Sequence, residues 1–327
     1  MNRRIQFLDY QPPVTDVQQD VLAGLTSFPK SLPSKLFYDA RGSALFDQIT
    51  RLPEYYLTDT EIALMATVVP QLSALVGPNI SIVELGSGSS RKIVPLLRHL
   101  PQAKTYVAID ISAAALKSAA LDLATAFPEH QICAIVADYA KPVPIPEHLR
   151  ALPLLAVYLG STIGNFHPKD AVAFLNMWST LLTPQDGLLI GVDLKKDPKI
   201  LHRAYNDAQG VTAAFNLNLL LRLNQELHTK FDLASFFHAA FYNAAHGRIE
   251  MHLVSRRPQT VTIGHRSIHF GEQESIRTEY SYKYTLNEFK QLAGDAGWNL
   301  VHSWVDAKQY FSMHLLRPTS HVALKPR

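Results

Sequence analysis

The sequence predicts an α/β fold with a mostly parallel sheet, joined to a second α+β domain built from the N-terminal segment and an insertion. Three observations lead to this prediction. Short apolar runs alternate with helical segments between residues 80 and 193, which is typical of parallel strands with helical crossovers. The first apolar run ends in a Gly-X-Gly turn. After residue 194 the alternation gives way to a long helical stretch and antiparallel strands, and it resumes near residue 285.

The elements follow in order along the chain. Thr58 is expected to cap a helix over 59–75, with Glu61 completing a capping box. Ser112 is expected to cap the third helix in the same way. The stretches 200–227 and 231–237 have helical character, and extended strands are expected at 248–255, 259–263 and 267–270. In the core we expect strands at 80–85, 105–110, 132–137, 154–159, 187–193, 300–306 and 310–316, with helices at 92–99, 112–127, 170–182 and 286–296.

The composition of the 327 residues excludes several classes of protein. Hydrophobic residues make up 47% and charged residues 18% of the chain, as in globular proteins. A net charge of +3 without a basic run does not favour nucleic acid as a partner. No apolar run approaches the ~20 residues of a membrane span, and no signal-peptide core follows Met1. We therefore expect a soluble cytoplasmic protein without a nucleic-acid or membrane partner.

Metal and hydrolase chemistry find no support in the motifs. The lone cysteine, Cys133, excludes an internal disulfide and a cysteine-based zinc site, and it fits a reducing compartment. The 14 histidines form no H-E-x-x-H pattern, and no G-x-S-x-G turn is present. We therefore expect no metal.

The turn after the first core strand indicates the cofactor. Glu84 precedes Gly86 and Gly88, but no third glycine follows at dinucleotide spacing and no G-K-[ST] is present. Such a Glu-x-Gly-x-Gly turn occurs in methyltransferases that bind S-adenosylmethionine (SAM), a sulfonium nucleoside that needs no phosphate cradle. Glu84 itself is expected to hold local backbone groups.

Polar residues at the next strand ends suit the same ligand. Asp110 ends the second strand, where an acid accepts hydrogen bonds from ribose hydroxyls. Asp138 ends the third strand and can bind the adenine amino group, and Tyr139 can stack on the base. Lys92 can reach the methionine carboxylate, although a lysine on a helix surface is an equal alternative.

The segment after the fourth strand, Gly-Ser-Thr-Ile-Gly-Asn at 160–165, is a candidate acceptor site. Asn165 offers a donor and an acceptor for a carboxylate or an amine. Tyr205 can face the same cleft. If the segment 278–281 is extended, Glu279 and Ser281 point the same way, which would suit the N–H of a small heterocycle. From spacing alone, an exposed acid at a strand end is the stronger interpretation of Glu279.

Taken together, the motifs resemble those of the histidine Nα-methyltransferases of ergothioneine biosynthesis. The resemblance runs from about residue 20 to the C-terminus, on Phe-Tyr-Asp at 37–39, Leu-Pro-Glu-Tyr-Tyr at 52–56, Leu-Gly-Ser-Gly-Ser-Ser at 85–90, the 160–165 segment, Ile-Glu-Met at 249–251 and Thr-Glu-Tyr-Ser at 278–281. It implies a Rossmann-like methyltransferase that trimethylates the α-amine of L-histidine to hercynine with three SAM, as a monomer.

The resemblance also implies roles for residues. SAM contacts fall on Gly86, Lys92, Asp110, Asp138 and Tyr139, the last where phenylalanine is frequent. Asn165, Tyr205 and Tyr38 are implied as catalytic residues. Substrate-binding roles fall on Tyr55, Phe46, Gly160, Asn165, Tyr205, Met251, Glu279, Tyr280 and Ser281. Met251 and Glu279 are of the histidine type, whereas relatives that act on indoles alter both positions. Tyr280 and Tyr282 are bulkier than expected beside the recognition pair.

The predicted division places a SAM-binding core at 60–196 and 285–327 and a substrate-binding domain at 1–59 and 197–284, with the substrate bound where they meet. Three alternatives stay open. One is an Nα-methyltransferase for another aromatic amino acid, such as tyrosine or tryptophan. The second is a non-catalytic SAM-binding scaffold, and the third is a nucleic-acid methyltransferase, although the latter's usual acceptor motif is missing after the fourth strand.

Overall fold

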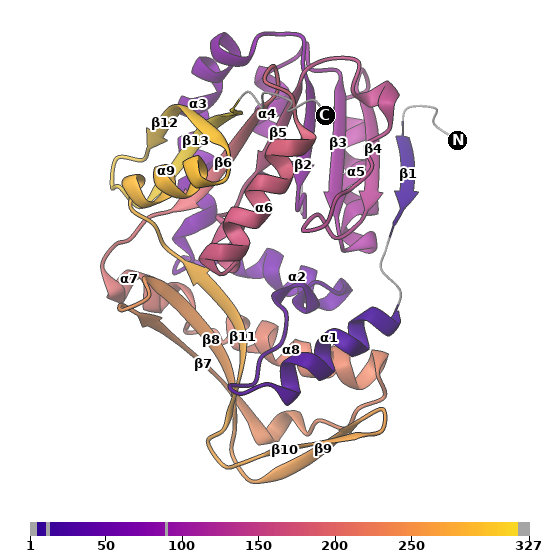
Figure 1. The fold of residues 1–327 in the computed structure, drawn as a ribbon, viewed down its shortest axis with the longest axis vertical. Helices are drawn as coiled ribbons and strands as arrows, with labels where there is room; N and C mark the ends of the chain where they lie inside the picture. Colours follow the sequence, from indigo (N-terminus) through magenta and orange to yellow (C-terminus); the bar gives the residue numbers. More distant parts are fainter. Residues whose placement is uncertain (1–4, 11–13, 89–90, 320–327) are drawn as a thin grey trace, which may run out of the picture. The chain divides into compact units, whose positions relative to one another are not determined.

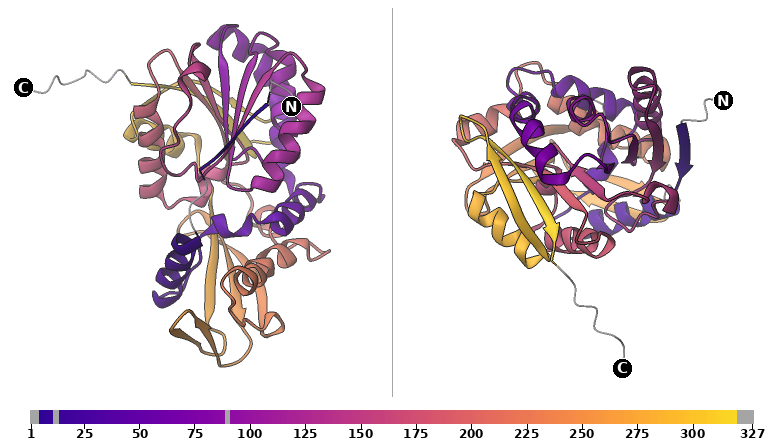
Figure 2. Two further views of the ribbon diagram at one scale, coloured as in Figure 1. Left: turned by 90° about the vertical axis from the view of Figure 1, so that its right-hand side faces the viewer. Right: turned by 90° about the horizontal axis from the view of Figure 1, so that it is seen from above.

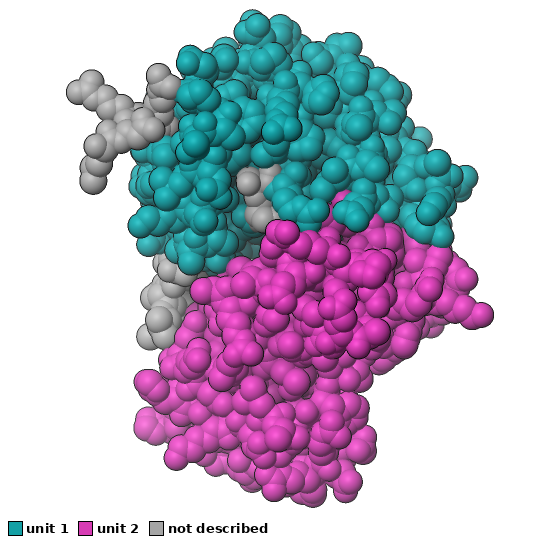
Figure 3. All heavy atoms as spheres, turned by 180° about the vertical axis from the view of Figure 1, so that it is seen from behind, with its two compact units in different colours: residues 1–10, 59–195, 283–327 teal, residues 11–58, 196–282 magenta. Residues whose placement is uncertain are grey.

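A computed structural model describes residues 5–10, 14–88 and 91–319 of the chain. It divides into two compact units, coloured separately in Figure 3. Unit 1 comprises residues 1–10, 59–195 and 283–327, and unit 2 comprises residues 11–58 and 196–282. Both units are therefore assembled from segments that are far apart in the sequence.

Unit 1 is built on a mostly parallel sheet. Its strands within the described residues lie in the order β1-β4-β3-β2-β5-β6-β13-β12 (Figure 1), and only β13 and β12 run antiparallel to their neighbours. The central strands are buried along nearly their whole length, which explains their largely apolar sequences. The strands are β1 (Ile5–Asp9), β2 (Ser81–Leu85), β3 (Thr105–Asp110), β4 (Gln131–Val136), β5 (Leu154–Tyr158), β6 (Gly187–Asp193), β12 (Trp298–Val305) and β13 (Phe311–Pro318).

Helices cover both faces of this sheet (Figure 2). On one face α3 (Tyr56–Val76), α4 (Ile93–His99) and α5 (Ala113–Ala126) share a hydrophobic core with the strands. Elsewhere α6 (Pro168–Leu181) packs against α9 (Leu286–Asp295), and these helices contact β13 and β12. Thr285 and Glu288 form a reciprocal capping box at the start of α9. Short 3-10 turns lie at η2 (Glu147–Leu149) and η3 (Thr162–Asn165).

Unit 2 has its own core between helices and an antiparallel sheet. Within the described residues, β7 (Phe236–Asn243), β8 (Arg248–Ser255) and β11 (Ser275–Tyr282) form a sheet in the order β11-β8-β7, and β9 (Gln259–Ile263) pairs with β10 (Arg266–Phe270). The helical segments are α1 (Val14–Thr26), η1 (Ser34–Phe37), α2 (Ala40–Ile49), α7 (Pro198–Ala204), α8 (Val211–Glu226) and η4 (Leu233–Ser235). Asp39 caps α2 by accepting a hydrogen bond from the Gly42 N–H at 2.6 Å.

The predicted alternation of strands and helices in the core is confirmed, with bounds that shift by one or two residues. One expectation was wrong in the type of element, and another in its continuity. The stretch 231–237 was expected to be helical, but it holds only η4 and then enters strand β7, because aromatic side chains there pack in the core of unit 2. The helical stretch 200–227 is broken into α7 and α8 at Gly210, whose φ of 73° is left-handed.

Two further differences concern helix starts and the N-terminus. Helix α3 begins at Tyr56, so Thr58 lies inside it and forms no capping box with Glu61, whose carboxylate has other partners. Ser112 precedes α5 as expected, but its side chain makes no capping hydrogen bond. Residues 5–9 form β1, which pairs with β4 and lies in unit 1, whereas the predicted boundary grouped 1–59 together. Among the described residues, no helix combines the length and apolarity that crossing a membrane requires.

Candidate functional site

The turn after β2 brings backbone N–H groups next to a carboxylate. Gly86 and Gly88 have φ values of 71° and 46°, which other residues rarely adopt. Asp110, at the end of the neighbouring strand β3, accepts hydrogen bonds from the N–H of Gly88 and the N–H of Ser112, both at 2.8 Å. A Cβ on Gly88 would meet nothing within 4 Å, so the turn faces open space. Ser89 and Ser90 of the motif lie outside the described residues.

The end of β4 completes this edge of the sheet. Asp138 accepts a hydrogen bond from the N–H of Ala140 at 3.1 Å and is half-buried. The ring of Tyr139 lies over Gly86, since a Cβ on that glycine would come within 3.3 Å of it. Burial raises the pKa of Tyr139, so its ring stays a neutral phenol that suits stacking. The structure therefore brings together Gly86, Asp110 and Tyr139 as the sequence predicted.

A buried acid lies directly before the glycine turn. Glu84 accepts a hydrogen bond from the Tyr106 hydroxyl at 2.5 Å. Burial raises the pKa of Glu84 to about 8, so this carboxyl is mostly protonated at neutral pH. Burial raises the pKa of Asp110 as well, although hydrogen bonds from the backbone of Ser112 and Gly88 oppose that effect. Since each oxygen of Asp110 has two acceptor positions, the carboxylate can still accept from a ligand hydroxyl.

Glu61 is a member of the site that the sequence analysis missed. Its side chain is fully buried, and both carboxylate oxygens accept from the N–H of Gly160, at 2.8 and 2.9 Å. Its Oε2 also lies 2.9 Å from the Nζ of Lys92, the predicted SAM contact. One carboxylate thus joins the residue before α4 to the segment after β5. No local pattern announces such a role, because the partners are distant in sequence.

The segment after β5 has an unusual backbone. Gly160 has a φ of 79°, and the next residue, Ser161, has a φ of 56° despite its side chain. Ser161 is buried, and its Oγ accepts a hydrogen bond from the N–H of Asp193 at 2.8 Å, which holds it in this conformation. Asn165 ends the η3 turn and is half-buried. Strain held by specific contacts is frequent at functional sites.

Unit 2 gathers the predicted aromatic residues into one cluster. The ring centroids of Tyr205 and Tyr55 are 6.3 Å apart, and those of Tyr55 and Phe46 are also 6.3 Å apart. Tyr38 lies edge-on to Phe46 at 5.8 Å, and Phe215 of α8 packs against both. Such rings provide faces that attract a cation. Phe215 carried no signal of its own in the sequence beyond its helical spacing.

The predicted recognition pair lies beside this cluster. The Tyr205 hydroxyl donates to the Oγ of Ser281 at 2.8 Å. Glu279 pairs with Met251 across β11 and β8, and paired residues share a face of the sheet. Met251, Glu279 and Ser281 are all buried. The sequence's conditional expectation of an extended segment at 278–281 is thereby confirmed, and the spacing-based alternative of an exposed Glu279 is wrong.

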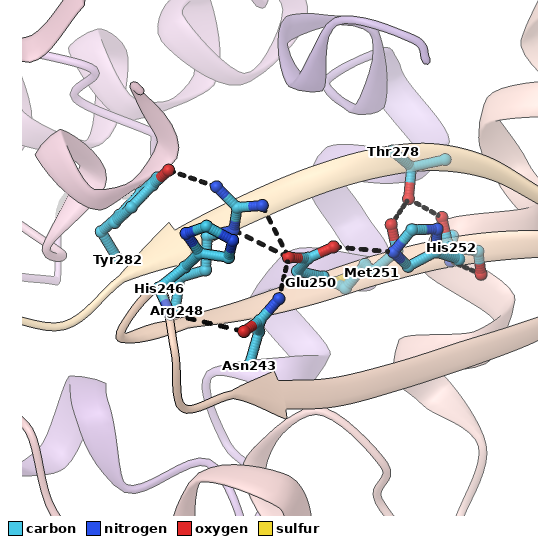
Figure 4. Close-up of polar contacts among 9 residues, drawn as sticks. Asn243, His246, Arg248, Glu250, Met251, His252, Thr278 and Tyr282 are labelled. Carbon is cyan, nitrogen blue, oxygen red and sulfur yellow. Dashed lines mark hydrogen bonds and ion pairs between the residues drawn. The ribbon is translucent and has the colours of Figure 1, made fainter. Parts of the chain in front are cut away.

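Tyr280 is not among the residues that the structure brings together. It lies on the other face of β11, where the guanidinium of Arg248 stacks 3.6 Å from its ring centroid. Arg248 also hydrogen-bonds the Tyr282 hydroxyl and lies 2.7 Å from Glu250 (Figure 4). These contacts hold both bulky tyrosines away from Glu279 and Ser281. A substrate-binding role for Tyr280 therefore stays a prediction without a supporting contact.

The residues at this edge of the sheet suit a nucleoside. In the described part of the chain, no group of three or more His, Cys, Asp or Glu side chains is placed to hold a metal ion. The open glycine turn and the acid at the end of β3 fit a nucleoside with a ribose diol. An aromatic ring over the turn fits its base.

These features define a class: the α/β sheet with its antiparallel final strands and this edge are those of a SAM-dependent methyltransferase, here with an additional antiparallel sheet. The chain belongs to the family of histidine-specific, SAM-dependent methyltransferases, whose model matches residues 17–318.

Curated relatives cover nearly the whole chain. It is 42% identical to a histidine N-alpha-methyltransferase of Mycolicibacterium smegmatis and 38% identical to one of Mycobacterium tuberculosis; each alignment covers 91% of this chain and 94% of the relative. It is 31% identical to ergothioneine biosynthesis protein 1 of Neurospora crassa, over 88% of this chain and 33% of that longer protein.

Proposed function

We propose that this protein transfers methyl groups from SAM to the α-amine of L-histidine, three times in succession, to give hercynine, the first step of ergothioneine biosynthesis. The observation that carries the proposal is the buried face of β11 and β8. There Glu279 and Ser281 lie with Met251 and the Tyr205 hydroxyl. A carboxylate and a hydroxyl on an apolar wall suit the two nitrogens of an imidazole.

In this proposal unit 2, made of the N-terminal segment and the insertion, is the substrate-binding domain. Glu279 accepts a hydrogen bond from the imidazole N–H, and Ser281 contacts the other nitrogen. Met251 forms the wall beside the ring. Tyr55, Phe46 and Tyr38 line the amine end, where their ring faces stabilise the fixed positive charge that accumulates as methyl groups are added.

Unit 1 holds the donor in the same proposal. Asp110 accepts hydrogen bonds from the ribose hydroxyls, Asp138 from the adenine amino group, and Tyr139 contacts the base. Lys92 attracts the methionine carboxylate, beside Gly86 and Gly160. SAM supplies an already activated methyl group, so the enzyme's task is to position the amine.

The proposed chemistry needs no strong base. The α-amine attacks the methyl carbon in line while the sulfur leaves, and the amine must shed a proton to present its lone pair. Asn165 and Tyr205 orient that nitrogen through their amide and hydroxyl groups, and water takes the proton. Orientation of this kind can lower the barrier by roughly 7–11 kcal/mol.

The test is mass spectrometry of L-histidine incubated with the protein and SAM. We expect stepwise gains of one, two and three methyl groups, and no such products from L-tyrosine or L-tryptophan. Methylation of another aromatic amino acid in place of histidine would contradict the substrate. SAM binding without any methylated amino acid would contradict the proposed methyltransferase activity.

Variants assign the residues. Glu279→Ala should raise the Kd of histidine far more than the Kd of SAM, because the buried acceptor for the ring N–H is removed. Asn165→Ala should slow methylation, and an unchanged rate with unchanged histidine affinity would remove Asn165 from the site. An equal loss of affinity for histidine and for SAM in Glu279→Ala would indicate a folding defect instead.

A further inference from the structure

We propose that Asn216, Thr278 and His238 are positioning residues that set the geometry of the histidine-recognition side chains in unit 2. The inference rests on the proposed function, since it concerns Glu279, Met251 and Tyr205. None of the three positioning residues is expected to touch the substrate. Their effect is exerted through the backbone that carries the recognition residues.

Strand β11 contains one residue more than its pairing with β8 requires. Arg277 pairs with His252, and Glu279 pairs with Met251, so Thr278 is an additional residue between two consecutive pairs. Such a bulge shifts every later residue of the strand by one position and changes the direction of its side chains. Without it, Glu279 would pair with Glu250 on the face that carries Arg248. The extra residue therefore places Glu279 and Ser281 on the face of Met251.

Buried hydrogen bonds hold Thr278 in place. Its side chain is fully buried, and its hydroxyl proton is shared between Asn216 Oδ1 at 2.7 Å and the carbonyl oxygen of Met251 at 3.1 Å. Thr278 and Met251 are labelled in Figure 4. Asn216 is itself fully buried on α8, and its Nδ2 donates to the carbonyl oxygen of His252 at 3.0 Å. Thr278 and Asn216 together thus tie the bulge to two consecutive carbonyl groups of β8, those of Met251 and His252.

The same network of hydrogen bonds extends to Tyr205. Asn216 Nδ2 also lies 2.9 Å from His238 Nδ1, and His238 Nε2 lies 2.9 Å from the carbonyl oxygen of Tyr205. Because an amide N–H can only donate and a carbonyl can only accept, His238 must be the neutral tautomer with its proton on Nε2. Burial lowers the pKa of His238, which favours this neutral form. One asparagine therefore connects the supports of Glu279, Met251 and Tyr205.

The residue types fit this role closely. Only an amide supplies an acceptor for Thr278 and two donors for His238 and His252 at one position. A carboxylate at 216 would keep the acceptor and lose both donors. Valine at 278 would keep the shape of threonine and leave the acceptor of Asn216 without this donor, a costly change in a buried site.

The test compares two identical substitutions made on two similar networks. Thr278→Val removes the hydroxyl that supports the bulge. The control is Thr229→Val, because Thr229 is buried and donates to Oδ1 of Asn224, another asparagine of α8, at 2.8 Å. That second network also holds Phe231, and it includes none of the recognition residues. Both variants are assayed as full chains for histidine and SAM affinity by calorimetry and for methylation kinetics.

We expect Thr278→Val to lower kcat/KM for L-histidine by about tenfold or more, since small misplacements of a bound group are costly. Its SAM affinity should stay within about twofold of wild type, a difference well below 1 kcal/mol. Thr229→Val should leave both kcat/KM for L-histidine and SAM affinity within about twofold of wild type. Thr278→Ser should restore most of the loss, because serine keeps the hydroxyl.

Other results would overturn the inference. Thr278→Val behaving like Thr229→Val would do so, as would equal losses of histidine and SAM affinity. Asn216→Asp tests the same network from α8, and unaltered histidine affinity there would also contradict it. Failure of the proposed function is distinguishable, because wild-type protein would then give no methylated histidine at all.

Discussion

Replacing Glu84 with glutamine should change how the stability of unit 1 depends on pH. Burial raises the pKa of this carboxyl from 4.5 to about 8. The native state therefore keeps a proton that the unfolded chain releases, and unfolding becomes easier as the pH rises through this window. The effect begins near pH 4.5 and is complete above about pH 8.

The magnitude follows from the size of the shift. A difference of about 3.5 pH units, at 1.36 kcal/mol per unit, corresponds to a contribution on the order of 5 kcal/mol. Glutamine has the same shape, keeps an acceptor for the Tyr106 hydroxyl and does not titrate. The free energy of unfolding of Glu84→Gln relative to wild type should therefore increase steadily between pH 5 and pH 8.

The free energy of unfolding of both proteins is measured by urea denaturation at closely spaced pH values. Calorimetry provides a second measurement. Taking the difference between variant and wild type cancels the titration of all other groups. Tyr106→Phe is an informative second variant, because the tyrosine hydroxyl lowers the pKa of Glu84 and its loss should extend the window to higher pH. Parallel pH profiles for wild type and Glu84→Gln would refute the reasoning.

Three other changes have definite expected outcomes. Asp110→Asn should weaken SAM binding by roughly tenfold or more in calorimetry, because an amide N–H would oppose the N–H of Gly88 or Ser112; an unchanged Kd would argue against Asp110 as the ribose ligand. Lys283→Met should destabilise the fold by about 3–5 kcal/mol in urea, since it leaves the fully buried Asp193 without its cation at 2.8 Å, and Asp193→Asn in the same chain should recover much of the loss. Gly191→Ala should cost about 1–3 kcal/mol and weaken SAM binding, because the new Cβ would lie 2.1 Å from Glu61 Oε1 and displace the partner of Lys92; full SAM affinity in this variant would separate Glu61 from the cofactor site.

The sequence was sufficient for those features whose signals are local. Short, largely apolar runs mark the buried parallel strands. The Gly-X-Gly turn comes directly after the first of these runs, and Asp110 stands at the end of the second. Features that depend on tertiary packing were missed. Strand β1 is short and half exposed, so its pattern is weak, and Phe236 and Phe237 lie in a strand that sequence alone does not distinguish from a helix.

The residues of the candidate site also differ in whether a local sequence signal or only tertiary packing reveals their role. Glu61 has the spacing of a capping residue, yet its carboxylate is used by Lys92 and Gly160, which are far away along the chain. The face on which Tyr280 lies also depends on an irregularity in strand pairing at Thr278, which alternation rules do not include. Predictions of side-chain direction therefore held for Glu279 and Ser281 relative to each other, but their common face needed the structure.

The extra residue in β11 also constrains how this fold can diversify. Exchanges at Met251 or Glu279 alter the chemistry of the buried face of β11 and β8 and leave the strand pairing intact. The loss or gain of one residue near Thr278 would instead exchange the two sets of side chains, placing the acid and the serine on the face of Arg248 and Glu250 and the tyrosines on the face of Met251. New substrate preferences are thus expected to arise in this strand by point replacement at constant length, and sequences that differ in length there should present a different set of side chains on this face.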